Sequence, residues 1–140
     1  MIELIVSDMD GTLLNDKMEV SASNVSAINE ANRLGIKFMV ATGRGYTEAV
    51  PALQEVGIDC PMITLNGGQV FDEDGKLVEN LGIDKTTTRH ILDDVKKYGL
   101  YCELMTSKGI FSDDKVRRID SMTSLLQESS PDTTCNMGLA

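Results

Sequence analysis

The segment DMDG at residues 8–11 places two carboxylates, Asp8 and Asp10, two positions apart in the sequence. An apolar run at residues 4–6 precedes it, and Gly11 permits a tight bend after it. Carboxylates this close repel each other unless a cation or a shared proton compensates. Because Mg²⁺ is commonly bound through one or two carboxylates, the segment predicts a magnesium site. The alternative is a turn in which the two aspartates only cap backbone groups.

Two further polar segments follow apolar runs and have the residue types of a phosphate-binding site. The first is ATGR at residues 41–44, and the second is NGG at residues 66–68. Thr42 offers a hydroxyl, and the N–H of Gly43 lies next to an expected helix start, where anions are favoured. Asn66 and Gly67 allow close approach to an anion, although Asn-Gly-Gly is also common in hairpin turns. We therefore expect Thr42, Gly43, Asn66 and Gly67 to bind phosphate.

The chain contains a second Asp-x-Asp-Gly segment at residues 72–75. It lies between the short apolar segments QVF and LVE, at residues 69–71 and 77–79. This arrangement is typical of an antiparallel hairpin in which Gly75 takes a positive φ angle. The sequence therefore predicts a turn here and a chemical site only at Asp8 and Asp10.

The elements that must position these residues alternate between strands and helices. We expect the first strand to be buried on both faces, as in a parallel sheet. Ser23 is the expected N-cap of the first helix, and Gly35 is its expected end. Pro51 is expected either to cost the second helix a hydrogen bond or to mark a later start of that helix. The order predicts an α/β fold with a doubly wound, Rossmann-like parallel sheet, whose strand ends form the ligand edge. The expected strands are residues 2–7, 37–42 and 62–65, and the expected helices are residues 21–35 and 47–56.

The pattern changes after about Gly82, where an α+β unit is expected. It comprises a helix over residues 86–98, alternating residues at 101–111 and a polar helix at about 113–127. The last twelve residues, SSPDTTCNMGLA, have no periodicity and predict a loop or a frayed end. The expected domains are residues 1–83, which carry Asp8, and residues 84–140.

Composition limits the classes of function. Lys and Arg number 13 against 22 Asp and Glu, a formal net charge of −9, which disfavours a nucleic-acid partner. No early apolar run is long enough for a signal or a membrane span, so we expect a cytoplasmic protein without a membrane partner. Cys60, Cys102 and Cys135 form no C-x-x-C pair and are expected to be buried thiols, and His90 is the only histidine.

The segments DMDGTLL at 8–14, ATGR at 41–44 and NGG at 66–68 resemble the haloacid dehalogenase superfamily, and within it the Cof-type phosphatases. The resemblance implies a Mg²⁺-dependent phosphatase that acts on small phosphorylated metabolites. It implies that Asp8 is the nucleophile and forms an aspartyl-phosphate, while Asp10 is the general acid and then the base. It also implies that Asp8 and Asp10 help to hold the metal. The segment from residue 84 would be part of the family's cap domain.

The resemblance assigns the phosphate contacts as well. Met9 would contribute its N–H, Thr42 and the Gly43 amide would bind the transferring phosphoryl group, and Asn66 and Gly67 would line the pocket. For Arg44 two roles stay open: it neutralises charge at the site, or it bridges surface carboxylates.

The sequence departs from the family pattern in two features. The family's later lysine and its third acidic cluster, of the G-D-x-x-N-D kind, have no match, and neither Lys108 nor Lys115 nor the acidic pair at 113–114 is assigned those roles. We expect a form truncated within the cap, weakly active or inactive, whose Asp8 strand has an unpaired edge that favours self-association. A non-catalytic phosphate- and metal-binding module is one alternative. A receiver-like phospho-accepting domain is another, although its acceptor would follow a later strand.

Overall fold

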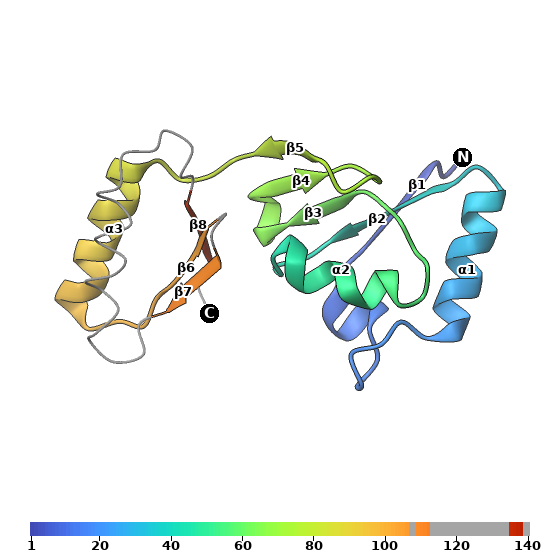
Figure 1. Cartoon of the computed structure of the whole chain (residues 1–140), viewed down its shortest axis with the longest axis horizontal. Helices are drawn as coiled ribbons and strands as arrows, with labels where there is room; N and C mark the ends of the chain where they lie inside the picture. The colour runs from blue at the N-terminus through green and yellow to red at the C-terminus, as the bar shows by residue number, and fades with distance from the viewer. Residues whose placement is uncertain (107–108, 113–134, 139–140) are drawn as a thin grey trace. The chain divides into compact units, whose positions relative to one another are not determined.

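The chain consists of two compact units, Met1–Asn80 and Leu81–Ala140. The structure is a computed structural model, and it describes residues 1–106, 109–112 and 135–138 (Figure 1). The division falls three residues before the boundary expected from the sequence. Each unit has a hydrophobic core and a sheet of its own.

The first unit is built on a five-stranded sheet in the order β1-β2-β3-β4-β5. The first three strands are parallel, and the last two are antiparallel to their neighbours. The register pairs Ser7 with Val40 and Ala41 with Ile63, so the carboxyl ends of the three parallel strands meet at one edge. This confirms the expected α/β fold. The strands are β1 Leu4–Ser7, β2 Lys37–Ala41, β3 Met62–Thr64, β4 Gln69–Phe71 and β5 Leu77–Asn80.

Two crossover helices, α1 (Ala22–Arg33) and α2 (Tyr46–Gln54), connect the parallel strands. The N-cap of α1 is Ser21, whose Oγ accepts a hydrogen bond from the Asn24 N–H at 3.2 Å, and not Ser23 as expected. Pro51 lies inside α2 and neither ends nor delays it. Its missing N–H removes one hydrogen bond, but packing of Ala49 and Leu53 into the core compensates.

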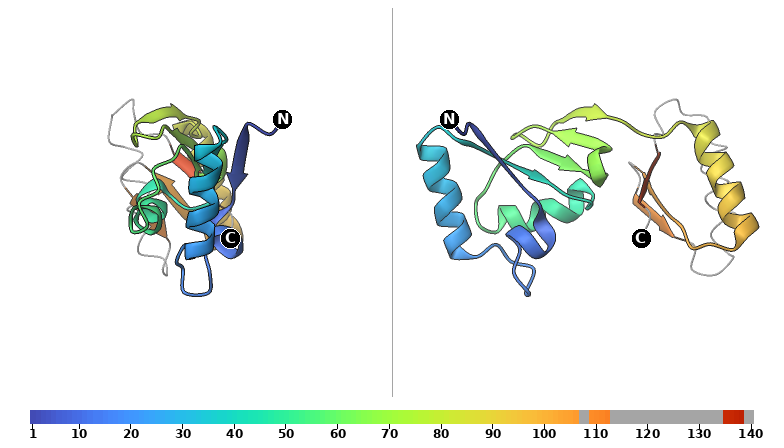
Figure 2. Two further views of the ribbon diagram at one scale, coloured as in Figure 1. Left: turned by 90° about the vertical axis from the view of Figure 1, so that its right-hand side faces the viewer. Right: turned by 180° about the vertical axis from the view of Figure 1, so that it is seen from behind.

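Both helices pack on one face of the sheet. Side chains from α1 and α2 share a core with alternate residues of β2 and β3, and Figures 1 and 2 draw the two helices on the same side of the strands. The expectation that β1 is buried on both faces is wrong: Leu4, Ile5 and Val6 are 48%, 39% and 50% exposed. β1 is the end strand of the sheet and pairs with β2 alone, so its second edge is free within the described residues.

Within its described residues, the second unit combines one helix with a three-stranded antiparallel sheet, in agreement with the expected α+β organisation. Helix α3 (Lys85–Tyr98) packs Leu92 against Cys102 and Leu104. The sheet has the order β7-β6-β8, with β6 at Glu103–Thr106, β7 at Gly109–Ser112 and β8 at Cys135–Gly138. No described helix is long and apolar enough to cross a membrane.

Strand β8 corrects the expectation of a loop or a frayed end at the carboxyl terminus. It pairs with β6 in antiparallel register, from Glu103 opposite Gly138 to Thr106 opposite Cys135. Pairing with the backbone of another strand can impose extended structure on a segment without a strand pattern. The expected polar helix at 113–127 and the residues Lys108 and Lys115 lie outside the described residues.

Candidate active site

The first Asp-x-Asp-Gly segment forms a wide turn at the end of β1. The turn covers Met9–Leu13, and the Leu14 N–H donates to the Met9 carbonyl at 2.9 Å, a spacing of five residues. Gly11 has a φ of 69°, which supports the predicted need for glycine at this bend. Met9 is fully buried in the core and anchors the turn. The sequence predicts the bend but not its π-type hydrogen bonds.

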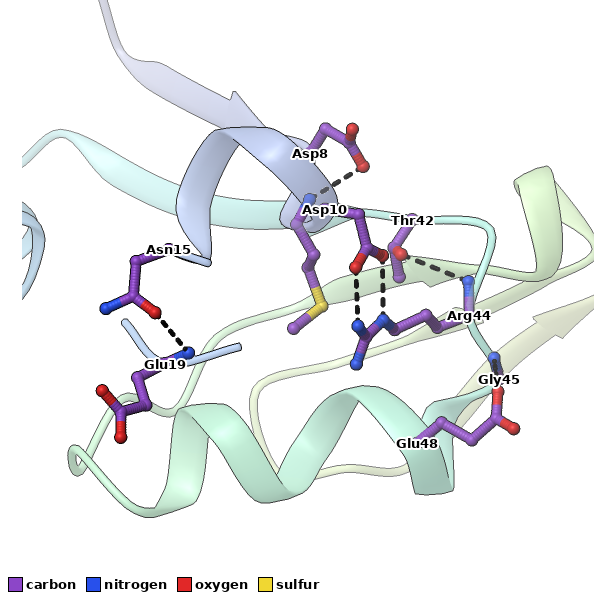
Figure 3. Close-up of polar contacts among 9 residues, drawn as sticks. Asp8, Asp10, Asn15, Glu19, Thr42, Arg44, Gly45 and Glu48 are labelled. Atoms are coloured by element: carbon purple, nitrogen blue, oxygen red, sulfur yellow. Dashed lines mark hydrogen bonds and ion pairs between the residues drawn. The ribbon is translucent and has the colours of Figure 1, made fainter. Parts of the chain in front are cut away.

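A short loop follows this turn and was not recognised from the sequence. Leu14 and Val20 form an antiparallel bridge. Inside the loop, the Asn15 side chain accepts hydrogen bonds from the N–H groups of Lys17 and Glu19, at 2.9 and 3.1 Å. Figure 3 shows the Asn15–Glu19 contact beside the site. The asparagine and its neighbouring aspartate are typical turn residues and were the available signal.

The loop after β2 and the turn after β3 are joined by backbone hydrogen bonds. The turn is a short 3-10 segment, Leu65–Gly67. The Leu65 N–H donates to the Arg44 carbonyl at 3.0 Å, and the Asn66 N–H donates to the Thr42 carbonyl at 3.2 Å. Leu65 and Asn66 have φ angles of 52° and 54°. Asparagine tolerates this left-handed backbone, whereas for leucine it is strained, and such strain is often found at functional sites.

A hollow of about 440 Å³ opens at the edge where the parallel strands end. Five of the predicted site residues line it together with two apolar side chains, and they come from three separate strand ends. Asp8 and Asn66 are exposed, whereas Thr42 is buried. The residues around the hollow are Asp8, Ala41, Thr42, Gly43, Ile63, Asn66 and Gly67.

Met9 and Asp10 are the two predicted site residues that do not line this hollow. The Met9 N–H donates to Asp8 Oδ1 at 2.7 Å, so this amide lies beside the Asp8 carboxylate. Asp8 Oδ2 has no hydrogen-bond partner within the part of the chain that the structure describes. One oxygen of Asp8 is therefore held and the other is available to a ligand.

The Asp10 carboxylate forms an ion pair with Arg44 on the neighbouring loop. Arg44 donates from Nε to Oδ2 at 2.8 Å and from Nη2 to Oδ1 at 2.6 Å (Figure 3). These hydrogen bonds lower the pKa of Asp10 below its ordinary value. Both roles left open for Arg44 remain predictions, because Asp10 is a site residue in the sequence analysis and is also a carboxylate that is 51% exposed. The repulsion expected between Asp8 and Asp10 is thus offset by a side chain of the chain itself.

Other candidate groups lie away from this edge. Cys60 is a buried free thiol, and burial raises its pKa to about 11, so it is a poor nucleophile. His90 is exposed on α3. A larger hollow of about 850 Å³ lies at the opposite ends of β1 and β2, where mostly apolar residues line it, so it offers no comparable chemistry. No cluster of three metal-ligating side chains was found among the described residues.

The fold and the polar edge define an α/β protein with a candidate site at the ends of its parallel strands, and comparison with known proteins identifies the family. The family model of haloacid dehalogenase-like hydrolases matches residues 5–136. The chain is 34% identical to Phosphatase YwpJ of Bacillus subtilis over 118 residues, which are 84% of this chain and 41% of YwpJ. The chain therefore belongs to the haloacid dehalogenase-like hydrolase family.

Two further comparisons agree with this family membership. The chain is 29% identical over 131 residues to the B. subtilis protein 5-amino-6-(5-phospho-D-ribitylamino)uracil phosphatase YwtE, covering 93% of this chain and 45% of YwtE. The solved structure of a haloacid dehalogenase-like hydrolase from B. subtilis superposes with a TM-score of 0.76 at 32% identity. That superposition covers 94% of this chain and 46% of the solved one. The chain thus spans somewhat less than half the length of these relatives.

Proposed function

We propose that the chain carries the nucleophile and phosphate-binding residues of a Mg²⁺-dependent phosphatase that acts on small phosphorylated metabolites. The convergence of Asp8, Thr42, Gly43, Asn66 and Gly67 around one hollow is the observation that carries the proposal. Membership of the hydrolase family supports it, as do relatives whose names describe phosphatases. The class of substrate is inferred from those relatives.

In this proposal Asp8 attacks phosphorus and forms an aspartyl-phosphate. Its Oδ2 atom has no hydrogen-bond partner within the described residues and is the attacking oxygen, while the Met9 N–H holds Oδ1 in place. Thr42, Gly43, Asn66 and Gly67 surround the transferring phosphoryl group and offer hydroxyl, amide and N–H donors to its oxygens. Asp10 protonates the leaving group and then activates water. Fixed donors stabilise the charge that develops during transfer without reorganisation, which is how such sites lower the barrier.

The residues fit Mg²⁺, which prefers oxygen ligands and is often held by one or two carboxylates together with substrate phosphate. Asp8 Oδ1, which accepts one hydrogen bond from the Met9 N–H, keeps a lone pair for this purpose, whereas the Asp10 carboxylate becomes available only when Arg44 releases it. Bound Mg²⁺ would neutralise the phosphoryl charge that otherwise opposes attack by a carboxylate. Asp8 and Asp10 are accordingly the proposed metal-binding residues.

The proposal is tested without turnover by amide NMR on the intact chain. Mg²⁺ is added first and inorganic phosphate second, with Asp8→Asn as the comparison. We expect the N–H resonances of Met9, Thr42, Gly43 and Asn66 to shift on addition of phosphate in the presence of Mg²⁺. Phosphate that bound equally well without Mg²⁺, or that shifted resonances only elsewhere, would contradict the proposal.

A non-catalytic phosphate-binding module is the second candidate, and the occupied Asp10 carboxylate favours it. With both oxygens bound to Arg44, Asp10 cannot act on a leaving group. Hydrolysis of p-nitrophenyl phosphate that requires Mg²⁺ and disappears in Asp8→Asn would support the enzyme. Phosphate binding without hydrolysis would support the module. A stable phosphorylated protein that does not release phosphate would instead support a receiver-like domain.

We also propose that two copies of the chain associate through the free edge of β1. Exposed Leu4, Ile5 and Val6 on an unpaired strand offer backbone groups and apolar side chains to a second strand. Sedimentation of the chain should then depend on concentration, and Val6→Lys should shift it toward the monomer. Val78→Lys, on the exposed strand at the other end of the sheet, is the matched control and should leave association unchanged. A monomer at every concentration would exclude the association.

A further inference from the structure

The Arg44–Asp10 pair is the one ion pair among the described residues that joins two different elements. The two residues lie 34 positions apart and are brought together because β1 and β2 are parallel neighbours. The pair occupies both carboxylate oxygens of Asp10, which fixes the orientation of its side chain. Figure 3 shows the guanidinium reaching from the loop after β2 to Asp10, whereas the Asp8 carboxylate turns to the Met9 amide.

Arg44 also belongs to the phosphate-binding loop. Its backbone N–H donates to Thr42 Oγ1 at 3.2 Å, and its backbone carbonyl accepts from the Leu65 N–H. The two residues before it, Thr42 and Gly43, line the hollow proposed for phosphate. A phosphate group there would lie beside the loop that carries the guanidinium.

Phosphate and carboxylate compete for the same donors of a guanidinium. Both anions accept two parallel N–H hydrogen bonds from arginine, and a phosphate dianion carries more charge than a carboxylate. The Arg44 side chain is 25% exposed and that of Asp10 is 51% exposed, so water already reaches the pair. Pairs in such surroundings are weak and can be exchanged readily.

Resting on the function proposed above, we infer that Arg44 is a positioning residue that holds Asp10 in an inactive orientation until a phosphate group binds. The bound phosphate takes over hydrogen bonds from the guanidinium, and the Asp10 side chain is released toward the leaving group. The pair thereby couples occupation of the hollow to the availability of Asp10. In the absence of substrate, both carboxylate oxygens of Asp10 stay bound to Arg44.

The chain offers a matched control, the Arg33–Glu30 pair on α1. Arg33 donates from Nε at 2.8 Å and from Nη2 at 2.6 Å, the same two distances as in the Arg44–Asp10 pair. The side chains of Arg33 and Glu30 are 69% and 55% exposed, and the two residues lie three positions apart on one helix. It has the same hydrogen-bond geometry but no phosphate site beside it.

The test follows the Nε–H NMR resonances of Arg44 and Arg33 in the full chain while inorganic phosphate is added in the presence of Mg²⁺. Arg44→Lys and Arg33→Lys assign the two resonances. We expect the Arg44 resonance to shift in step with the amides of Thr42 and Gly43, while the Arg33 resonance stays in place. An Arg44 resonance that stayed constant while those amides shifted would overturn the inference and leave the proposed function intact. If no amide of the hollow shifted either, both would fail.

A double-mutant cycle separates release from the simple loss of a negative charge. At a saturating concentration of Mg²⁺, Asp10→Asn frees the guanidinium and should tighten phosphate binding several-fold, whereas Glu30→Gln, which removes the same charge from the control pair, should not. In an Arg44→Met background the effect of Asp10→Asn should vanish, because the two substitutions act through one contact. Equal tightening by Asp10→Asn and Glu30→Gln, or an undiminished effect of Asp10→Asn without Arg44, would contradict the inference.

Discussion

Two segments of the chain share the pattern Asp-x-Asp-Gly and differ in almost every contact. In the first, Asp8 follows a parallel strand and lines a hollow, and Asp10 pairs with Arg44 from another loop. In the second, Asp72 Oδ1 accepts hydrogen bonds from the N–H groups of Asp74 and Lys76, at 3.1 and 2.8 Å. The first segment has partners distant in the sequence, whereas the second stabilises its own turn between β4 and β5.

The difference shows that strand direction, more than the letters of a motif, decides what an acidic segment can do. Parallel strands bring their carboxyl ends to one edge, so Asp8 meets residues that follow β2 and β3. A hairpin returns the chain upon itself, and its aspartate then finds only neighbouring N–H groups. We therefore propose a chemical role for the first segment and a structural role for the second.

The largest expected effect is that of Asp8→Asn. If the Asp8 carboxylate is the nucleophile, its replacement by an amide should lower Mg²⁺-dependent hydrolysis of p-nitrophenyl phosphate by about 10³-fold or more. Asp72→Asn should change the rate little, because the amide oxygen still accepts the two hydrogen bonds of the turn. Equal losses from the two substitutions would refute the distinction between the segments.

Asp10→Asn should produce the second largest effect, and its size should depend on the leaving group. A general acid contributes roughly 10²-fold to 10⁴-fold when the leaving alcohol is poor. We therefore expect an alkyl phosphate to lose about 10²-fold in kcat, with a KM that falls as phosphate binding tightens, and p-nitrophenyl phosphate to lose much less in kcat. Measuring kcat and KM of the Asp10→Asn variant with both substrates shows whether the loss depends on the leaving group. A uniform loss for the two substrates would assign Asp10 to metal binding alone.

The glycines that end the two segments provide a comparison of stability. Gly11 and Gly75 have φ angles of 69° and 75°, so an alanine at either costs about 1 to 2 kcal/mol in backbone strain. A Cβ at Gly11 would meet no atom, whereas one at Gly75 would collide with the hydroxyl of Tyr46, whose ring stacks on Phe71. Gly75→Ala should cost a further amount of about 1 to 3 kcal/mol.

Urea unfolding of the two glycine variants measures this difference in the free energy of unfolding. The Gly75→Ala variant should unfold at the lower urea concentration. If Gly11→Ala were the less stable of the two, the first turn would be packed more tightly than its open surroundings indicate, and the stability comparison would have to be reversed.

The smallest expected effect concerns Asp84, an aspartate that binds local groups as Asp72 does. Its Oδ1 accepts from the N–H groups of Thr86 and Thr87, and its Oδ2 accepts from the Thr87 hydroxyl. The hydrogen bonds with Thr87 and Thr86 lower the pKa of Asp84 below its ordinary value of 3.8. A lowered folded-state pKa means that the carboxylate stabilises α3 above the ordinary pKa and that this stabilisation is lost as pH falls through the lowered value.

Circular dichroism of the helix against pH tests the cap. Asp84→Asn keeps an acceptor for the N–H groups but does not titrate, so its helix signal should respond less to acid than that of the unaltered chain. Asp93→Asn, at an exposed position within α3, should leave the acid response unchanged. The same acid response in all three proteins would show that the Asp84 cap is not a pH-sensitive contact.

Much of the fold could be predicted from local patterns. The apolar runs and helical spacings located β1 to β3, α1, α2 and α3, and the glycine at position 75 located the hairpin. Exposure of β1 could not be read from its composition, because burial depends on which strand lies beside it. Strand β8 was missed for a related reason, since its extended form arises with the β6 pairing.

The residues of the candidate site were predictable by type, but their contacts were not. Five of the seven predicted residues line one hollow because parallel pairing aligns the strand ends, which the alternation of strands and helices already indicates. The Asp10–Arg44 pair depends on side-chain orientation across 34 positions, which no local pattern specifies. The left-handed backbone at Leu65 could not be predicted from the sequence either, because leucine rarely adopts a positive φ angle.

The most direct test of the account is a crystal structure of the chain with Mg²⁺ and orthovanadate. The account predicts vanadium at bonding distance from a carboxylate oxygen of Asp8, with its other oxygens contacting Thr42, Gly43 and Asn66 and with Mg²⁺ beside it. Vanadate and Mg²⁺ bound at the hairpin aspartates, or vanadate in the hollow but out of reach of Asp8, would contradict the central claim that Asp8 is directed at phosphorus.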